Sequence, residues 1–139
     1  MGLLDTGKGV ADKAKNIPEI SNIKKKIIYE EDRILELLAD IGRKYYIAHE
    51  IDKEAFDKIC EDITTRRIRI KKMKFEINMM KGFKVCLKCD SEINAKFEFC
   101  GVCGARLPNI DDEEFLKLDD SEYYVDSKGF FGSAPNEAK

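Results

Sequence analysis

The sequence predicts a mainly α-helical protein with a small β unit: an antiparallel two-helix coiled-coil hairpin, then a four-cysteine unit and an acidic tail. Three observations carry this prediction. Apolar residues recur every seven positions over two long stretches, four of the five cysteines form two C-x-x-C pairs, and Asp and Glu are concentrated after residue 108. Because 37% of the 139 residues are charged, little apolar material remains for one deep core, which favours exposed helices beside a small, separately stabilised unit.

The hairpin is expected over residues 18–82. Pro18 and Glu19 suit the first turn of a helix, because Pro needs no N–H partner there and Glu suits the positive end of the helix dipole. Residues 1–17 are small, polar and weakly patterned. We therefore expect them to form a loose N-terminal segment or a short amphipathic helix.

Two heptad series define the two helices. The first contains Ile20, Ile27, Ile34, Ile41 and Ala48, and the second contains Phe56, Ile63, Ile70 and Ile77. The stretch between them is long enough only for a tight turn, with Asp52 as the N-cap of the second helix, so the helices should be antiparallel. If the turn centres near residue 50, the two series face each other over their full length.

Three positions of this seam are charged: Glu30, Lys44 and Arg66. Lys44 lies near the turn, where its ammonium group can reach water past its apolar stem. The register places Glu30 and Arg66 in adjacent central layers, so we predict that they pair. Buried charges of this kind usually cost stability but can fix the register of a helix pair.

The first helix has more apolar surface than one partner helix can cover. The additional residues beside its seam are Ile28, Leu35, Leu38 and Tyr45. At about 100° per residue, seam and flank form a stripe about 150° wide. The flank could be covered by the N-terminal segment, by the C-terminal tail, by a second copy of the chain in a homodimer, or by another protein.

The cysteines carry the strongest chemical signal. The pairs are Cys86 with Cys89 and Cys100 with Cys103, separated by ten residues. Four thiolates in this arrangement suit one tetrahedral Zn²⁺ per chain, and each C-x-x-C places two sulfurs on one tight turn. We expect the unit to span residues 83–107, with a short hairpin from Ser91 to Phe99. Iron is a chemically compatible alternative, whereas a redox C-x-x-C would stand alone near a βαβ unit, which the sequence lacks.

A unit of this size has almost no apolar core, so metal binding should provide its folding free energy. Four protein ligands close the coordination sphere and leave no position for a substrate. The sequence also offers no phosphate-binding loop, and His49, the only histidine, lies in the predicted turn. We therefore expect a non-enzymatic protein.

The cysteine region resembles the short zinc-ribbon family of bacterial and archaeal proteins, in which C-x-x-C-G precedes F-C-x-x-C-G-x-x-L. The matching residues are the four cysteines, Ile93, Phe99, Gly104 and Leu107. Asp90 replaces the usual Gly and Leu87 the common Pro, and Asp can adopt the left-handed angle of that Gly. The resemblance covers about 22 residues. It implies zinc binding and an interaction module, without a particular activity.

A basic strip on the second helix suggests nucleic acid as an alternative partner. Its candidate contacts are Arg66, Arg67, Arg69, Lys71, Lys72 and Lys74. A basic helix that leads into a zinc ribbon could follow phosphates. These residues are spread around the helix, however, and aromatic residues for base stacking are sparse. A solvated helix, or a surface covered by the acidic tail, explains the strip equally simply.

The tail, residues 108–139, contains nine Asp and Glu against three Lys, although the whole chain has a net charge of −2. It could lie along the basic strip or act as a partly disordered binding peptide. No apolar run is long enough for a transmembrane helix, and the cysteine pattern fits a reducing compartment, so we expect a cytoplasmic protein.

The function best supported by the sequence is a zinc-binding scaffold or protein–protein interaction module with an unidentified protein partner. The first alternative is a nucleic-acid-associated accessory factor that uses residues 66–84 and the ribbon. The second alternative is a metal or redox sensor that uses the four thiolates.

Overall fold

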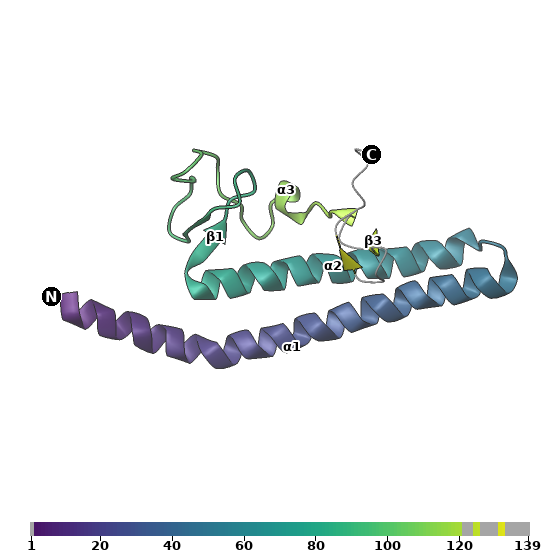
Figure 1. The fold of residues 1–139 in the computed structure, drawn as a ribbon, viewed down its shortest axis with the longest axis horizontal. Helices are drawn as coiled ribbons and strands as arrows, with labels where there is room; N and C mark the ends of the chain where they lie inside the picture. Colours follow the sequence, from purple (N-terminus) through teal and green to yellow (C-terminus); the bar gives the residue numbers. More distant parts are fainter. Residues whose placement is uncertain (1, 121–123, 126–130, 133–139) are drawn as a thin grey trace.

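The computed structural model describes residues 2–120, 124–125 and 131–132, with side chains over residues 16–120. Two long helices, α1 (Gly2–Ala48) and α2 (Lys53–Lys81), lie side by side and run in opposite directions (Figure 1). The remaining elements are short: β1 (Phe83–Val85), β2 (Glu92–Asn94), α3 (Glu113–Leu116), β3 (Tyr124–Val125) and β4 (Phe131–Gly132). Strands β1 and β2 form one antiparallel sheet, and β3 and β4 form another. Among the described residues, no helix has the length and apolar content needed to cross a membrane.

Helix α1 begins earlier than the sequence predicts. It starts at Gly2 and contains Pro18, so the helix start at Pro18 is wrong, and of the two alternatives for the N-terminal segment the structure has a helix over residues 2–17. A proline inside a helix removes one hydrogen bond and bends the axis, and α1 bends in its purple N-terminal part (Figure 1). This part extends past the end of α2 (Figure 1), so no facing helix demands an apolar seam there. That explains the weak patterning of residues 1–17.

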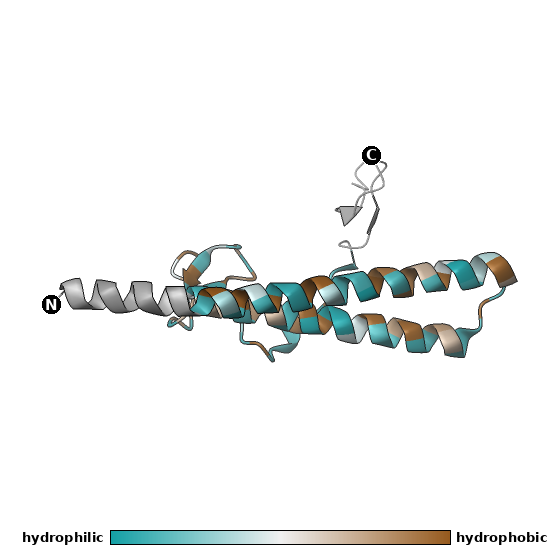
Figure 2. Ribbon diagram, turned by 90° about the horizontal axis from the view of Figure 1, so that it is seen from below, coloured by the Kyte–Doolittle hydropathy of each residue, from teal (hydrophilic) through white to brown (hydrophobic). Residues whose placement is uncertain are grey.

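The core between α1 and α2 follows the predicted heptads. Its buried members are Ile27, Ile34, Ile63, Ile70 and Ile77, which recur every seven residues on each helix. In Figure 2, hydrophobic positions alternate with hydrophilic ones along α2 and the coloured part of α1, as expected for helices that bury only one face. The hydrogen bond from Asn16 Nδ2 to the Met80 carbonyl, 3.2 Å long, lies within one helical turn of the predicted register.

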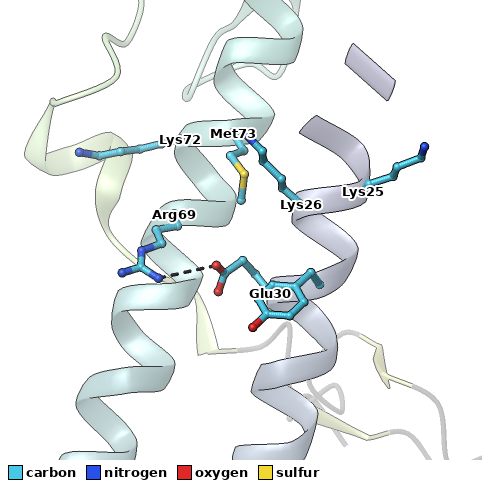
Figure 3. A pocket seen from close by; sticks show the side chains of 7 residues that line it. Lys25, Lys26, Glu30, Arg69, Lys72 and Met73 are labelled. Carbon is cyan, nitrogen blue, oxygen red and sulfur yellow. Dashed lines mark ion pairs between the residues drawn. The ribbon is translucent and has the colours of Figure 1, made fainter. Parts of the chain in front are cut away.

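The predicted pair of Glu30 and Arg66 is confirmed. Arg66 Nη1 donates to Glu30 Oε2 at 2.7 Å, and the two side chains are only 16% and 12% exposed. Arg66 Nε also contacts Asp62 at 2.9 Å, and Arg69 approaches the second Glu30 oxygen at 3.6 Å (Figure 3). The hydrogen bond to Glu30 raises the pKa of the Arg66 guanidinium above its usual value. A charged network therefore sits in the middle of the helix pair.

The connection between the helices is the tight turn that the sequence predicts. His49 has a left-handed φ of 53°, and its N–H bonds to the Tyr45 carbonyl at 2.8 Å, which ends α1. Asp52 then caps α2, because its carboxylate accepts a hydrogen bond from the Ala55 N–H at 3.3 Å. Two local caps thus reverse the chain within four residues, 49–52.

Gly82 ends α2 and turns the chain into β1. It has a φ of 93°, and its N–H bonds to the carbonyls of Asn78 and Met79. A side chain at this angle is strained because Cβ crowds the neighbouring carbonyl. The cysteine region therefore starts from a fixed point at the end of the helix.

We expect Gly82→Ala to lower the free energy of unfolding by about 1 kcal/mol, because alanine pays the steric cost of a positive φ. Gly101→Ala is the matched control: an added Cβ there meets nothing within 4 Å, and Gly101 has no positive φ. Urea unfolding followed by circular dichroism measures both variants. Equal losses of unfolding free energy in the two variants would show that the positive φ does not explain why residue 82 is glycine.

Candidate metal centre

Each C-x-x-C pair lies in the turn of its own small hairpin. Strands β1 and β2 pair with Phe83 opposite Asn94 and Val85 opposite Glu92, so the first pair of cysteines lies in the connection between them. The second pair is enclosed by a bridge between Phe99 and Arg106. The expected hairpin from Ser91 to Phe99 is therefore wrong. Hairpins enclose the two pairs instead of joining them.

The two turns have the same backbone hydrogen bonds. The N–H of Asp90 bonds to the Cys86 carbonyl, and the N–H of Gly104 bonds to the Cys100 carbonyl, both at 2.9 Å. Asp90 and Gly104 are both left-handed, with φ of 59° and 76°. The expectation that Asp90 can adopt the left-handed angle of a glycine is confirmed, because aspartate tolerates this region better than most residues.

The two turns bring the four sulfurs together. Cys86 Sγ lies 3.6 Å from Cys103 Sγ, and Cys89 Sγ lies 3.5 Å from Cys100 Sγ. All four sulfurs lie within 4.8 Å of one another. Sulfurs that bind one tetrahedral ion at about 2.3 Å would be about 3.8 Å apart, so the four cysteines are positioned to hold a single metal ion. Cys60 is exposed on α2 and lies outside this cluster.

Among the described residues 83–107 there is one buried apolar cluster, and cysteines make up most of it. Cys86, Cys100 and Leu107 are 0%, 3% and 2% exposed, with the partly buried Ile93 and Ala105 against them. Cys103, by contrast, is exposed. So small a cluster buries little apolar surface, and its stability must depend strongly on what the sulfurs bind.

The surroundings of Cys89 and Cys103 shift the pKa values of the two thiols in opposite directions. The side chain and the backbone N–H of Ser91 both bond to Cys89 and lower its pKa to about 6. At Cys103 the backbone bond from Ala105 lowers the pKa, but desolvation and the other three cysteines outweigh it and raise the pKa to about 11. The thiolate is the form that binds a metal, so the lowered pKa favours the ligating state of Cys89.

Four large apolar side chains of this region are exposed, and sequence reasoning did not identify them. They are Leu87, Val102, Phe97 and Phe99, at 46%, 70%, 59% and 60% exposure. Leu87 lies between Cys86 and Cys89, and Val102 lies between Cys100 and Cys103. A tight turn points side chains at such positions outward, so their place inside the C-x-x-C motifs was the sequence signal that could have predicted their exposure.

The basic strip is largely occupied by the chain itself. We name residues 109–120 the acidic segment. Arg67, which is buried, donates to Asp120 Oδ1 and to the Asp119 carbonyl, both at 2.7 Å. Lys72 pairs with Asp111 at 3.2 Å, and Lys71 donates to the backbone of the same segment. Of the two expected arrangements of the tail, contact with the strip therefore describes residues 109–120.

Aromatic contacts also hold the acidic segment against α2. Phe115 of α3 lies edge-on to Phe75 of α2, with ring centroids 5.2 Å apart, and the Lys71 ammonium group lies 5.2 Å from the Phe115 centroid. Arg66 and Arg69 contact Glu30 instead, and Lys74 is exposed. Five of the six candidate nucleic-acid contacts thus have partners within the chain. The rest of the predicted tail, from residue 121, lies outside the described residues except for β3 and β4.

The predicted partner surface on α1 is only partly as expected. Ile28, Leu35 and Tyr45 are 56%, 41% and 52% exposed, whereas Leu38 packs against the core between the helices. A groove of about 450 Å³ between α1 and α2 lies nearby and is lined by Lys25, Lys26, Tyr29, Glu30, Arg69, Lys72 and Met73 (Figure 3). In that view Lys25 points away from α2, while Glu30 reaches toward Arg69.

Comparison of the chain with protein-family models, with curated proteins and with solved structures gives no match. The geometry of the cysteine cluster therefore carries the functional argument.

Proposed function

We propose that Cys86, Cys89, Cys100 and Cys103 hold one structural Zn²⁺ and make residues 83–107 a zinc ribbon. The observation that supports this proposal is the approach of all four sulfurs to within 4.8 Å from two equivalent turns. Four sulfur ligands are typical of closed, structural zinc sites. Such a site leaves no position for a substrate, so the metal acts by fixing the fold.

The function that fits this architecture is a non-enzymatic interaction module. The helical hairpin forms a long arm, and the metal-bound ribbon forms a rigid tip that presents exposed apolar side chains, such as Phe97, Phe99 and Val102, at its surface. Exposed apolar side chains on a rigid unit are typical of protein-binding surfaces. We propose that the ribbon binds a protein partner through these side chains.

Nucleic-acid binding by the basic strip is a weaker proposal. The strip could bind phosphates only if it gave up contacts that its cations make within the chain, such as Arg67 with Asp120 and Lys72 with Asp111. Because these contacts are electrostatic, such binding should depend steeply on salt. Absence of binding to DNA or RNA at low salt would exclude this alternative.

We expect one zinc ion per chain when the protein is purified without chelator. Native mass spectrometry measures the metal as a mass increment, and elemental analysis identifies it. The matched control is Cys60→Ser, which removes the one cysteine outside the cluster and should leave the zinc content unchanged. Cys100→Ser should remove most of it, because three thiolates bind zinc far more weakly.

Two results would contradict the proposal. Protein without metal that takes up no added zinc would show that the clustered sulfurs are not a metal site. Iron as the only bound metal would replace the structural role with electron transfer.

A further inference from the structure

The apolar outer face of α1 has no occupant among the described residues. We name as the outer stripe Ile28, Leu35, Ala39, Gly42 and Tyr46. At about 100° per residue these positions fall within about 60° of the helix circumference. Ile28, Leu35 and Tyr46 are 56%, 41% and 78% exposed. On α2, by comparison, Met79 is the only large apolar side chain of similar exposure.

Within the described residues, the structure removes two intramolecular explanations for this face. The N-terminal segment cannot fold back over α1, because residues from Gly2 onward continue the same helix. The acidic segment does not cover it either, because its contacts are with α2, through Arg67, Lys71, Lys72 and Phe75. Among the described residues, no other segment is placed to cover the stripe.

Small residues in the stripe point to a second helix as the occupant. Gly42 lies inside α1 without a positive φ, and an added Cβ would meet nothing within 4 Å. A glycine inside a helix costs about 1 kcal/mol relative to alanine, and nothing in the monomer requires it. Gly42 and Ala39 have no large side chain, so another helix can approach the backbone of α1 closely at these positions.

We propose that the outer stripe binds the same stripe of a second copy, with the two α1 helices antiparallel. A two-fold axis between Glu31 and Asp32 places Ile28 of each copy opposite Leu35 of the other. The same register places Gly42 opposite Ser21 and Tyr46 opposite Ile17. Apolar residues thus meet apolar residues and Gly42 meets a small residue along one self-complementary surface, while Ala39 lies opposite Lys24.

The groove beside Ile28 strengthens this arrangement. It lies between α1 and α2, has a volume of about 440 Å³, and is lined by Lys24, Ile27, Ile28, Lys74, Ile77 and Asn78. Its apolar floor suits an apolar side chain. Leu35 of the second copy lies opposite Ile28, at the edge of this groove, in the proposed register.

The charge pattern of α1 favours the antiparallel orientation. Lys25 lies beside the first half of the stripe, and Glu36 lies on the same flank beside its second half. Antiparallel helices bring these opposite charges together, and parallel helices would place like charges side by side. Copies of Asp32 meet near the axis and oppose association. Asp32→Asn should therefore tighten the dimer.

The length of the surface is sufficient for a stable contact. From Ile17 to Tyr46 the helix rises about 44 Å, which is comparable with long helical bundles. The two Ile28–Leu35 pairs lie on either side of the axis, and Asp32 is the charged residue between them. The dimer would leave both zinc ribbons free, because they follow α2 and not α1.

Sedimentation of the full chain tests the proposal. We expect a dimer that Leu35→Glu weakens about 30-fold or more, because the charge would be buried at the centre of the contact. The matched control is Ile47→Glu: Ile47 is 78% exposed on the same helix but about 100° from Tyr46, so the dimer should persist. Unchanged helical circular dichroism would show that Leu35→Glu still folds. A monomeric wild-type chain, or equal effects of both substitutions, would overturn the proposal.

Cross-linking tests the register. In a Cys60→Ser background, a mixture of the Ile28→Cys chain and the Leu35→Cys chain should form a disulfide-linked dimer under mild oxidation. Either chain alone should not, because each introduced cysteine lies about 10 Å from its own copy, beyond disulfide reach. Cross-linking of the Ile28→Cys chain with itself would overturn the antiparallel register. The sedimentation readout does not depend on zinc, so failure of the zinc proposal would leave it interpretable.

Discussion

Removal of the proposed zinc ion by a chelator should unfold residues 83–107 and leave the helical hairpin intact. The buried cluster of this region consists of Cys86, Cys100 and Leu107, so without metal its burial cannot offset the conformational entropy of about two dozen residues. Binding of structural zinc by comparable peptides is worth roughly 10–16 kcal/mol. No other change proposed for this protein is expected to cost as much folding free energy.

Hydrogen exchange resolved by residue is the appropriate measurement. The amides of Asp90 and Gly104, which bond to cysteine carbonyls in the two turns, should lose protection after chelation. Amides around Ile34 and Ile70 should keep it, because the core between α1 and α2 contains no metal ligand. Protected turns in metal-free protein would mean that the fold of this region does not depend on zinc. Cys60→Ser should reproduce the wild-type pattern in both states.

The sequence predicted best those features that depend on spacing alone. Two cysteines with two residues between them must share a turn, so the cluster follows from four positions. The heptads likewise fixed which isoleucines meet, because a seven-residue period keeps one face of a helix toward its partner. The pairing of Glu30 with Arg66 follows from the same register and needed no further information.

Other features depend on contacts that no local pattern encodes. The prediction that the first helix starts at Pro18 was wrong. Proline is a good first residue of a helix, but it is also tolerated inside one at the cost of a bend. The acidic segment gives no indication of which cations it meets, since Asp111 and Asp120 could each pair with several nearby residues. The hairpins around the cysteine pairs were missed because strands of two or three residues show no alternation.

Replacing Arg66 alone should destabilise the hairpin strongly. Arg66→Leu leaves the Glu30 carboxylate, in a side chain that is 12% exposed, without its 2.7 Å partner. An uncompensated buried charge costs about 3–5 kcal/mol, and Arg69 at 3.6 Å keeps the effect near the lower limit. Urea unfolding at neutral pH should therefore show a loss of about 3 kcal/mol. Arg69→Leu is the matched control, and because Arg69 is more exposed it should cost less than about 1 kcal/mol.

The double substitution Glu30→Leu with Arg66→Leu separates stability from specificity. It removes both charges from the seam, so the variant should be at least as stable as the wild-type chain. Apolar residues at both positions would, however, make shifted registers of the helix pair more favourable, because the charged pair no longer opposes them. We expect faster hydrogen exchange of the amides near residues 30 and 66, although the variant unfolds at the same or a higher urea concentration. A double variant less stable than Arg66→Leu would show that the two side chains do not form one unit, and the register deduced from them would be wrong.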